Sequence, residues 1–216
     1  MLNNIKACIF DMDGTLVDSM WVWRRIDIDY LKKFNLEVPK DMGKDFEGAS
    51  MREVAQYFKN RFNIEDDIDT MINEWNDMAM YNYTHNVKLK PHAKEFLEYL
   101  YEKEIKIGLY TSNSLVLAKA TLKALNIEKY FDVITAGCSG IKGKPEPDGY
   151  LLTAKNLNVE PKNCLVFEDL TMGIQAGINA NMRTCAVKDT YSDYQDSAKR
   201  ELADYYLEDY YEAYKS

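Results

Sequence analysis

The chain has 216 residues, of which 46% are hydrophobic and 29% are charged, a composition typical of a globular protein and unlike that of collagen, a disordered tail or a disulfide-rich miniprotein. With 27 Lys and Arg against 35 Asp and Glu, the formal net charge is -8, so broad nucleic-acid binding is not expected. A small anionic substrate remains compatible with this charge, because the charge of a site is set locally.

The N-terminal residues contain neither an apolar run of signal-peptide length nor a cleavage site, and no stretch approaches 18 uninterrupted apolar residues. The sequence therefore predicts a protein without a membrane span. Its four cysteines, Cys8, Cys138, Cys164 and Cys185, form no C-x-x-C pair, which weakens a zinc or redox interpretation. All except Cys138 lie in apolar runs, where buried free thiols are expected. Free thiols favour a reducing, cytoplasmic location.

The first predicted strand is residues 5–10, a short apolar run that stops at Asp11 as a buried parallel strand would. Apolar residues at helical spacing then predict helices over residues 21–34, 51–62 and 68–83. The stretch from residue 17 to residue 85 contains no predicted strand. Its methionine and aromatic side chains are expected to form the core between these helices.

From residue 87 onward, predicted strands alternate with predicted helices. Strands are expected at residues 105–110, 131–135, 164–167, 183–187 and 205–207, and helices at residues 91–103, 115–125, 147–157 and 172–180. This alternation predicts an α/β fold with βαβ units and a parallel sheet, into which the preceding helical stretch is inserted after the first strand. The C-terminal tyrosines (Tyr205, Tyr206, Tyr210, Tyr211 and Tyr214) have no explanation in the sequence.

Polar residues follow the predicted strands at the points where these strands end. They are Asp11, Asp13 and Thr15 after the first strand, Thr111, Ser112 and Asn113 after the second, Lys144 beyond the third, and Glu168 and Asp169 after the fourth. Each group alone would be an ordinary turn, a helix cap or an exposed lysine. Because ligands bind at the carboxyl ends of strands in an open parallel sheet, the recurrence of polar residues at successive strand ends favours one shared crevice.

This combination of side chains suits phosphoryl transfer. Several acids cannot stay charged and dry without a cation, and carboxylate oxygens together with a substrate phosphate favour Mg²⁺. One carboxylate can accept the phosphoryl group as an aspartyl-phosphate, and a second, two residues along, can protonate the leaving oxygen and later deprotonate water. Lys144 would help to neutralise the phosphoryl group. Thr111 and the backbone N–H groups of its turn, which includes Ser112 and Asn113, can donate hydrogen bonds to phosphoryl oxygens.

These residues resemble the four motifs of the haloacid dehalogenase-like hydrolase superfamily. Residues 11–19 resemble the first motif, Thr111 the second, Lys144 within residues 143–148 the third, and residues 167–177 the fourth. The motifs occur in the order of the family, and the pattern between them agrees over nearly the whole chain. The closest resemblance is to the phosphatase and β-phosphoglucomutase-like branch.

The resemblance implies a doubly wound, Rossmann-like catalytic core formed by residues 1–16 and 87–216, with an α-helical cap domain inserted over residues 17–86. It also implies that Thr111 and Lys144 hold the phosphoryl oxygens of the substrate.

The resemblance assigns the acids as well. Asp11 would be the nucleophile and a magnesium ligand, and Asp13 the general acid and base, with its backbone carbonyl on the metal. Asp169 would complete the magnesium site, with Glu168 as a ligand or a neighbour. An aspartate at position 13 fits phosphoryl transfer, because the true dehalogenases of the superfamily lack it.

Phosphatase and mutase remain alternatives. The mutases of this branch typically carry a histidine on the first cap helix, twelve residues past the nucleophile, and Trp23 stands there in this chain. The two histidines, His85 and His92, are expected on the surface. A magnesium-dependent phosphatase of a small phosphorylated metabolite, such as a sugar phosphate, is therefore favoured over a β-phosphoglucomutase-like hexose-phosphate mutase.

The segment from residue 46 to residue 53 resembles the substrate-specificity loop of the family. Arg52 would contact the part of the substrate beyond the phosphate, or else be a surface arginine that opens a helix. A third alternative is a non-catalytic metabolite-binding module, but a pure binder has no need of both Asp11 and Asp13. The expected partners are Mg²⁺ and a small phosphorylated substrate, with no nucleic acid or membrane partner, and the default oligomeric state is a monomer.

Overall fold

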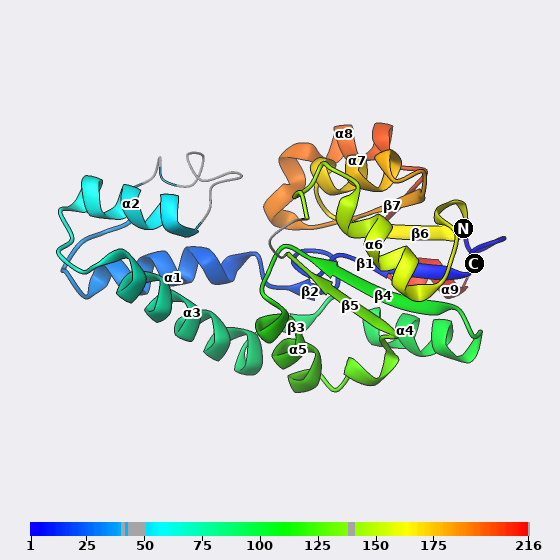
Figure 1. The fold of residues 1–216 in the computed structure, drawn as a ribbon, viewed down its shortest axis with the longest axis horizontal. Coiled ribbons are helices and arrows are strands. Elements are labelled where there is room, and N and C mark those ends of the chain that lie inside the picture. The colour runs from blue at the N-terminus through cyan, green and yellow to red at the C-terminus, as the bar shows by residue number, and fades with distance from the viewer. Residues whose placement is uncertain (40–41, 43–50, 138–140, 216) are drawn as a thin grey trace. The chain divides into compact units, whose positions relative to one another are not determined.

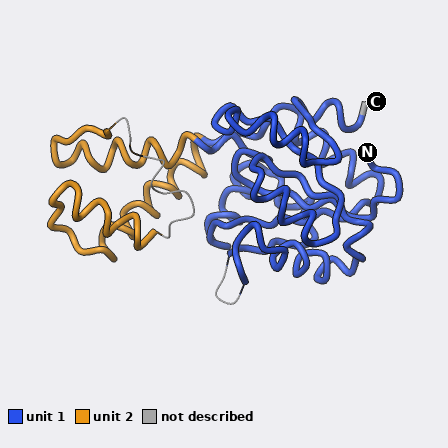
Figure 2. The backbone as a smooth tube through the Cα atoms, turned by 90° about the horizontal axis from the view of Figure 1, so that it is seen from above, with its two compact units in different colours: residues 1–20, 87–216 blue, residues 21–86 orange. Residues whose placement is uncertain are grey.

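The structure of the chain is a computed structural model that describes residues 1–39, 42, 51–137 and 141–215 (Figure 1). It contains two compact units (Figure 2). Unit 1 comprises Met1–Met20 and Val87–Ser216, and unit 2 comprises Trp21–Asn86. The chain therefore leaves unit 1 shortly after the first strand and returns to it once unit 2 is complete.

Unit 1 is built on a parallel sheet whose six strands, among the described residues, lie in the order β5-β4-β1-β6-β7-β8. The strands are β1 (Ala7–Phe10), β4 (Lys106–Thr111), β5 (Val133–Ala136), β6 (Cys164–Glu168), β7 (Arg183–Val187) and β8 (Tyr205–Leu207). This order confirms the predicted α/β class. Because β1 lies between β4 and β6, the residues that follow these three strands meet at the same edge of the sheet.

Helices cover both faces of this sheet (Figure 1). They are α4 (Ala93–Glu102), α5 (Leu115–Ala124), α6 (Asp148–Leu157), α7 (Thr171–Asn179), α8 (Asp196–Leu202) and α9 (Tyr211–Lys215). Segments of 3-10 helix occupy Glu128–Tyr130, Pro161–Asn163 and Thr190–Gln195. Successive side chains of a strand point to opposite faces, so each face of the sheet has its own core.

The two cores differ in composition. Ile9 of β1 belongs to a buried cluster with Tyr150 and other residues of α6 and α7. The next side chain, Phe10, points the other way and stacks on Phe167 of β6, with ring centroids 4.6 Å apart. Phe96 of α4 meets Phe10 edge-on at 6.1 Å. The second core is therefore aromatic, and two of its members, Phe10 and Phe167, immediately precede Asp11 and Glu168 in the chain.

Some elements are absent from the sequence-based prediction. Val17–Asp18 (β2) pairs antiparallel with Lys88–Leu89 (β3), although no strand was expected in the stretch that begins at residue 17. Two residues are too few to show a strand period, and the short helices α8 and α9 carry too few turns for a helical one.

The thiols of Cys8, Cys164 and Cys185 are free and buried, as predicted, and Cys138 lies outside the described residues. Burial also raises the pKa of the Cys185 thiol well above its usual range, which favours the unreactive neutral form.

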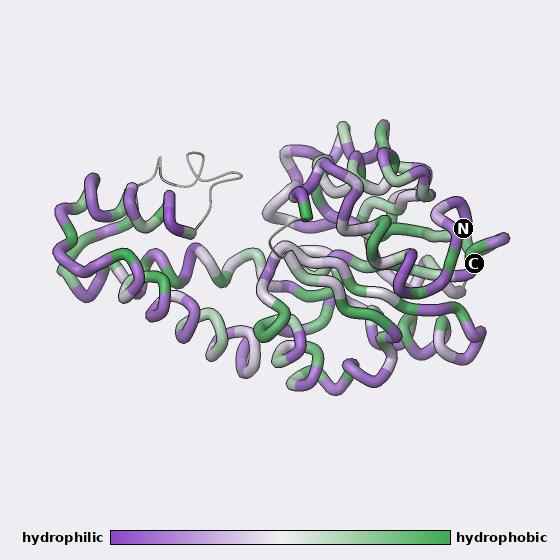
Figure 3. The backbone as a smooth tube through the Cα atoms, viewed as in Figure 1, coloured by the Kyte–Doolittle hydropathy of each residue, from purple (hydrophilic) through white to green (hydrophobic). Residues whose placement is uncertain are grey.

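Unit 2 consists of the helices α1 (Trp21–Lys32), α2 (Met51–Phe62) and α3 (Ile68–His85). Hydrophobic and hydrophilic residues are interleaved along them, as expected for amphipathic helices (Figure 3). Trp75 lies at the centre of their core, in edge-on contact with Phe58 at 5.0 Å and with Tyr30 at 5.4 Å. Tyr30, Phe58 and Trp75 thus form a helical core, as predicted for this stretch, whereas Tyr81 of α3 is exposed. None of the described helices is both long and apolar enough to cross a bilayer.

Asp67 offers a test of what holds unit 2 together. It is the N-cap of α3, and its side chain accepts a hydrogen bond from the backbone N–H of Thr70 at 3.0 Å. We expect Asp67→Ala to lower the thermal midpoint of unit 2 by about 4–8 °C, because a backbone donor loses its partner.

All three tryptophans lie in unit 2, so tryptophan fluorescence reports its unfolding. Asp67→Asn is the matched control, since asparagine caps helices about as well as aspartate does. An equal loss in both variants would contradict the capping role.

Candidate active site

Three acids converge at the carboxyl edge of the sheet in unit 1. Asp11 follows β1 directly, Glu168 ends β6, and Asp169 comes next in the chain. All three are buried, and each offers a carboxylate oxygen within 4.8 Å of the others. We refer to Asp11, Glu168 and Asp169 as the acid cluster. These are three of the four acids that the strand-end pattern expects in one crevice.

Lys144 supplies positive charge to this cluster. Its ammonium lies 2.5 Å from Asp11 Oδ1 and forms an ion pair with Glu168. The rings of Tyr110 and Tyr150 lie 5.2 and 5.7 Å from the same Nζ, and the Tyr150 hydroxyl donates to Glu168 Oε1 at 2.9 Å. The lysine head is therefore held between two carboxylates and two aromatic faces, a fixed geometry that a solvated surface lysine lacks.

The two carboxylate oxygens of Asp169 differ in their hydrogen bonding. Its Oδ1 accepts a hydrogen bond from the Thr15 hydroxyl at 3.0 Å, whereas Oδ2 is buried without a hydrogen-bond partner among the described residues. Gly14 adopts a positive φ of 75°, and a Cβ at this position would lie 2.3 Å from Asp169 Oδ2. Only glycine leaves room for that carboxylate so close to the loop.

The carboxylate of Asp13 does not belong to the acid cluster. It accepts a hydrogen bond from Asn113 Nδ2 at 2.6 Å and another from Ser19 Oγ at 2.6 Å. Asp13 is partly exposed, unlike Asp11. Two carboxylates on one loop therefore have different surroundings, one buried among acids and one held by neutral donors at the rim.

The other expected site residues fall into two groups. Thr111 is buried, and its hydroxyl accepts the backbone N–H of Asn113 at 3.1 Å, so it shapes the turn that follows β4. Ser112 is exposed in the same turn. Arg52 belongs to unit 2, where its exposed side chain pairs with Asp69 at 2.5 Å. Residues 46–50 of the expected specificity loop lie outside the described residues.

Burial dominates the electrostatics of the acid cluster. It raises the pKa of Asp11 to about 8, with Glu168 and Asp13 adding to the rise and Lys144 opposing it. Burial and the charge of Glu168 likewise raise the pKa of Asp169 well above its usual range. For Lys144, burial acts to lower the pKa, but Asp11 and Glu168 outweigh it and raise the pKa. One ammonium thus faces three carboxylates.

The acid cluster fits a magnesium ion. Its donors are carboxylate oxygens, the ligands that a hard divalent cation prefers. The buried and unpartnered Oδ2 of Asp169 is an acceptor that a cation would satisfy, and Gly14 keeps the space beside it open. A cation here would also oppose the rise in the pKa of Asp11 and Asp169.

Sequence reasoning did not give a role to several residues that build this site. Thr15 follows the first predicted strand as a hydroxyl residue, but its hydrogen bond to Asp169 spans 154 positions of sequence. Tyr150 faces Glu168 from α6, where a tyrosine looks like any other core residue of an amphipathic helix. Ser19 lies within the first motif, and its short spacing of six residues after Asp13 is a signal in the sequence that points to this contact.

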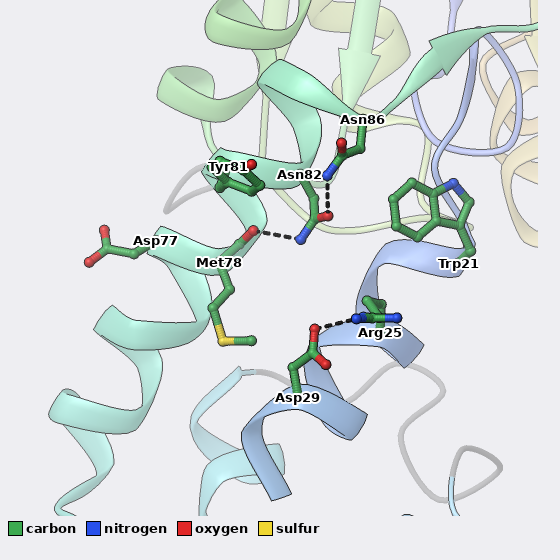
Figure 4. A pocket seen from close by; sticks show the side chains of 8 residues that line it. All are labelled: Trp21, Arg25, Asp29, Asp77, Met78, Tyr81, Asn82 and Asn86. Carbon is green, nitrogen blue, oxygen red and sulfur yellow. Dashed lines mark hydrogen bonds and ion pairs between the residues drawn. The ribbon is translucent and has the colours of Figure 1, made fainter. Parts of the chain in front are cut away.

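A separate cavity of about 640 Å³ lies within unit 2, between α1 and α3 (Figure 4). Its polar groups are largely engaged with each other: Arg25 pairs with Asp29 at 2.6 Å, and Asn86 donates to Asn82 at 3.0 Å. Trp21 borders it. The acids and the lysine that suit phosphoryl transfer do not line this cavity, because they converge in unit 1.

Comparison with known proteins agrees with this geometry. The chain is 32% identical to a phosphorylated carbohydrates phosphatase of Thermotoga maritima over 82% of each chain. It is 27% identical to the fructose-1-phosphate phosphatase YqaB of Escherichia coli, over 87% of this chain and 99% of that one. A crystal structure of β-phosphoglucomutase from Clostridium difficile superposes with a TM-score of 0.74 at 25% identity, over 95% of this chain and 91% of that one.

The family model described as haloacid dehalogenase-like hydrolase matches residues 8–187, a span that includes the acid cluster, Lys144 and the whole of unit 2. The chain therefore belongs to the haloacid dehalogenase-like hydrolase family.

Proposed function

We propose that this protein is a magnesium-dependent phosphatase that hydrolyses a small phosphorylated metabolite through a phosphorylated Asp11. The observation that carries the proposal is the acid cluster bound to Lys144, with Asp13 two residues from Asp11 on the same loop. Buried carboxylates of this number suit a site that binds a cation and a phosphoryl group together.

In the proposed reaction, a carboxylate oxygen of Asp11 attacks phosphorus and forms an acyl phosphate, while the bond from phosphorus to the substrate oxygen breaks. Asp13 gives its proton to that leaving oxygen. Asp13 then takes a proton from water, whose oxygen attacks phosphorus and releases inorganic phosphate and free Asp11. The hydrogen bonds from Asn113 and Ser19 hold Asp13 in place for both proton transfers.

The surrounding residues stabilise charge. Lys144 and the hydroxyl of Thr111 would face the phosphoryl oxygens, where negative charge develops. Asp11, Asp169, Glu168 and the backbone carbonyl of Asp13 would hold Mg²⁺, which supplies further positive charge to the phosphoryl group when bound. Ser112, exposed in the turn that follows β4, would offer a further hydrogen-bond donor beside them.

The names of the relatives support a phosphorylated carbohydrate as the substrate class. We propose that residues 17–86 act as a cap domain, because unit 2 is inserted directly after the loop that carries Asp11 and Asp13. Arg52 is the candidate within this unit for contact with the part of the substrate beyond the phosphate.

Asp11→Asn tests the nucleophile. We expect release of inorganic phosphate to fall at least about a thousandfold across a panel of sugar phosphates, because the amide cannot form the acyl phosphate. Glu102→Gln, at the exposed end of α4, removes one negative charge elsewhere and should retain activity. Activity that persists in Asp11→Asn, or tight metabolite binding by a wild-type protein that releases no phosphate, would contradict the proposal, and the latter would favour a binding module.

Asp169→Asn tests the metal site, because magnesium should reverse which protein, variant or wild type, has the higher unfolding temperature. Without metal, we expect the variant to unfold at a higher temperature than the wild type, because one of three mutually repelling buried carboxylates is gone. With magnesium at about a hundred times its dissociation constant, the wild type should gain about 2.7 kcal/mol and become the more stable protein.

Thermal unfolding of both proteins, once with EDTA and once with magnesium chloride, measures which is the more stable in each condition. A wild type whose midpoint does not respond to magnesium would show that the acid cluster does not bind this ion.

The β-phosphoglucomutase structure makes the mutase a second candidate. We expect β-glucose 1-phosphate, supplied with the 1,6-bisphosphate, to give no bisphosphate-dependent glucose 6-phosphate, because Trp23 cannot take the part of the histidine that the mutases carry at the matching position. The measurement is the ratio of glucose 6-phosphate to free phosphate. Conversion that depends on bisphosphate, with little free phosphate, would make the protein a mutase.

A further inference from the structure

Tyr210 lies buried beneath the acid cluster, in the tyrosine-rich C-terminal segment. Its ring centroid is 6.1 Å from that of Phe10, 5.9 Å from that of Phe167 and 5.6 Å from that of Phe96, on which it stacks. Phe10 immediately precedes Asp11, and Phe167 immediately precedes Glu168. The ring of Tyr210 thus packs against the two strands at the points where they present their acids.

The hydroxyl of Tyr210 reaches the loop between Asp11 and β2, where it donates to the backbone carbonyl of Thr15 at 3.1 Å. The rest of this loop is closed on itself: Gly14 N–H donates to the Val17 carbonyl at 3.0 Å, and the Leu16 and Val17 N–H groups donate to the Met12 carbonyl at 2.9 and 3.0 Å. Tyr210 therefore fixes the tight loop from outside, from a position 195 residues away in sequence.

Thr15 connects this contact to the acid cluster. Its carbonyl accepts from Tyr210, and its hydroxyl donates to Asp169 Oδ1 at 3.0 Å. The residue is fully buried, so its backbone and side chain cannot shift separately without loss of a buried hydrogen bond. The order of contacts is thus Tyr210 to Thr15 and Thr15 to Asp169.

We propose that Tyr210 is a positioning residue, whose hydroxyl holds Thr15, and through it the Asp169 carboxylate, in the geometry that the metal site requires. The inference rests on the proposed function of that site. It also gives a role to a tyrosine of the C-terminal segment. A tyrosine suits the position because its ring fills the aromatic core while its hydroxyl supplies the donor. Phenylalanine would fill the same space and leave the Thr15 carbonyl without this donor.

Tyr210→Phe and Tyr130→Phe form a matched pair. Tyr130 is also buried and donates a hydroxyl hydrogen bond, at 2.7 Å, but to Glu98 of α4. Hydrogen exchange in metal-free protein, read on the peptide that covers residues 12–17, is the first measurement. We expect exchange there to rise about fivefold in Tyr210→Phe, the equilibrium equivalent of one ordinary hydrogen bond, and not to change in Tyr130→Phe.

Magnesium titration followed by thermal unfolding is the second measurement. We expect the magnesium concentration at half-maximal stabilisation to rise about fivefold in Tyr210→Phe and to stay at the wild-type value in Tyr130→Phe. At fixed, subsaturating magnesium, kcat should fall by a similar factor with little change in KM. A merely structural role would lower the metal-free midpoint of both variants and leave the magnesium dependence alone.

Unchanged exchange at residues 12–17 in Tyr210→Phe overturns the proposal, as does an unchanged magnesium midpoint. Failure of the proposed function gives a different result. A wild-type protein that releases no phosphate from any substrate would contradict the phosphatase, while raised exchange and a shifted magnesium midpoint in Tyr210→Phe would still support the hold of Tyr210 on the metal site.

Discussion

Three carboxylates share a buried space at the carboxyl edge of the sheet, and a single ammonium, that of Lys144, offsets part of their charge. Lys144 pairs with Asp11 and Glu168, which leaves Asp169 with a single hydroxyl donor and an unsatisfied oxygen. Such an arrangement is costly to fold, because the carboxylates repel each other and burial raises the pKa of Asp11 and Asp169. The surrounding elements are best understood as the structure needed to keep these carboxylates together at a site where a cation would offset their charge.

The parallel sheet meets the first part of that need. Because β1 is central and flanked by β4 and β6, the residues that follow these three strands come together whatever their separation in sequence. The backbone meets the second part, since Gly14 lets the loop approach Asp169 more closely than any side chain would permit. Close approach and burial together make the acids respond to each other, which exposed carboxylates at the same spacing would do only weakly.

The sequence could predict the residues at strand ends, but not the buried residues that support them. Asp11, Glu168 and Lys144 were found because strand ends are visible in a pattern of apolar runs, and parallel strands bring their ends to one edge. Tyr150 and Tyr210 were not found, because a buried tyrosine that donates to a site has the same local pattern as one that only packs. Their partners lie 18 and 195 residues away, a relation that periodicity does not record.

A second hydrogen-bonded contact supports the loop that carries Asp169, and it accounts for the buried Lys199. Ser192 Oγ donates to the Asp169 backbone carbonyl at 3.0 Å, and the fully buried Lys199 donates to Ser192 Oγ at 3.2 Å while pairing with Asp196 at 3.1 Å. A buried lysine is costly unless it is paired and hydrogen-bonded, and here it is both. Residues after β7 therefore hold the backbone of Asp169, as residues after β8 hold Thr15. The C-terminal segment is thus part of the support for the acid cluster, although none of its side chains belongs to that cluster.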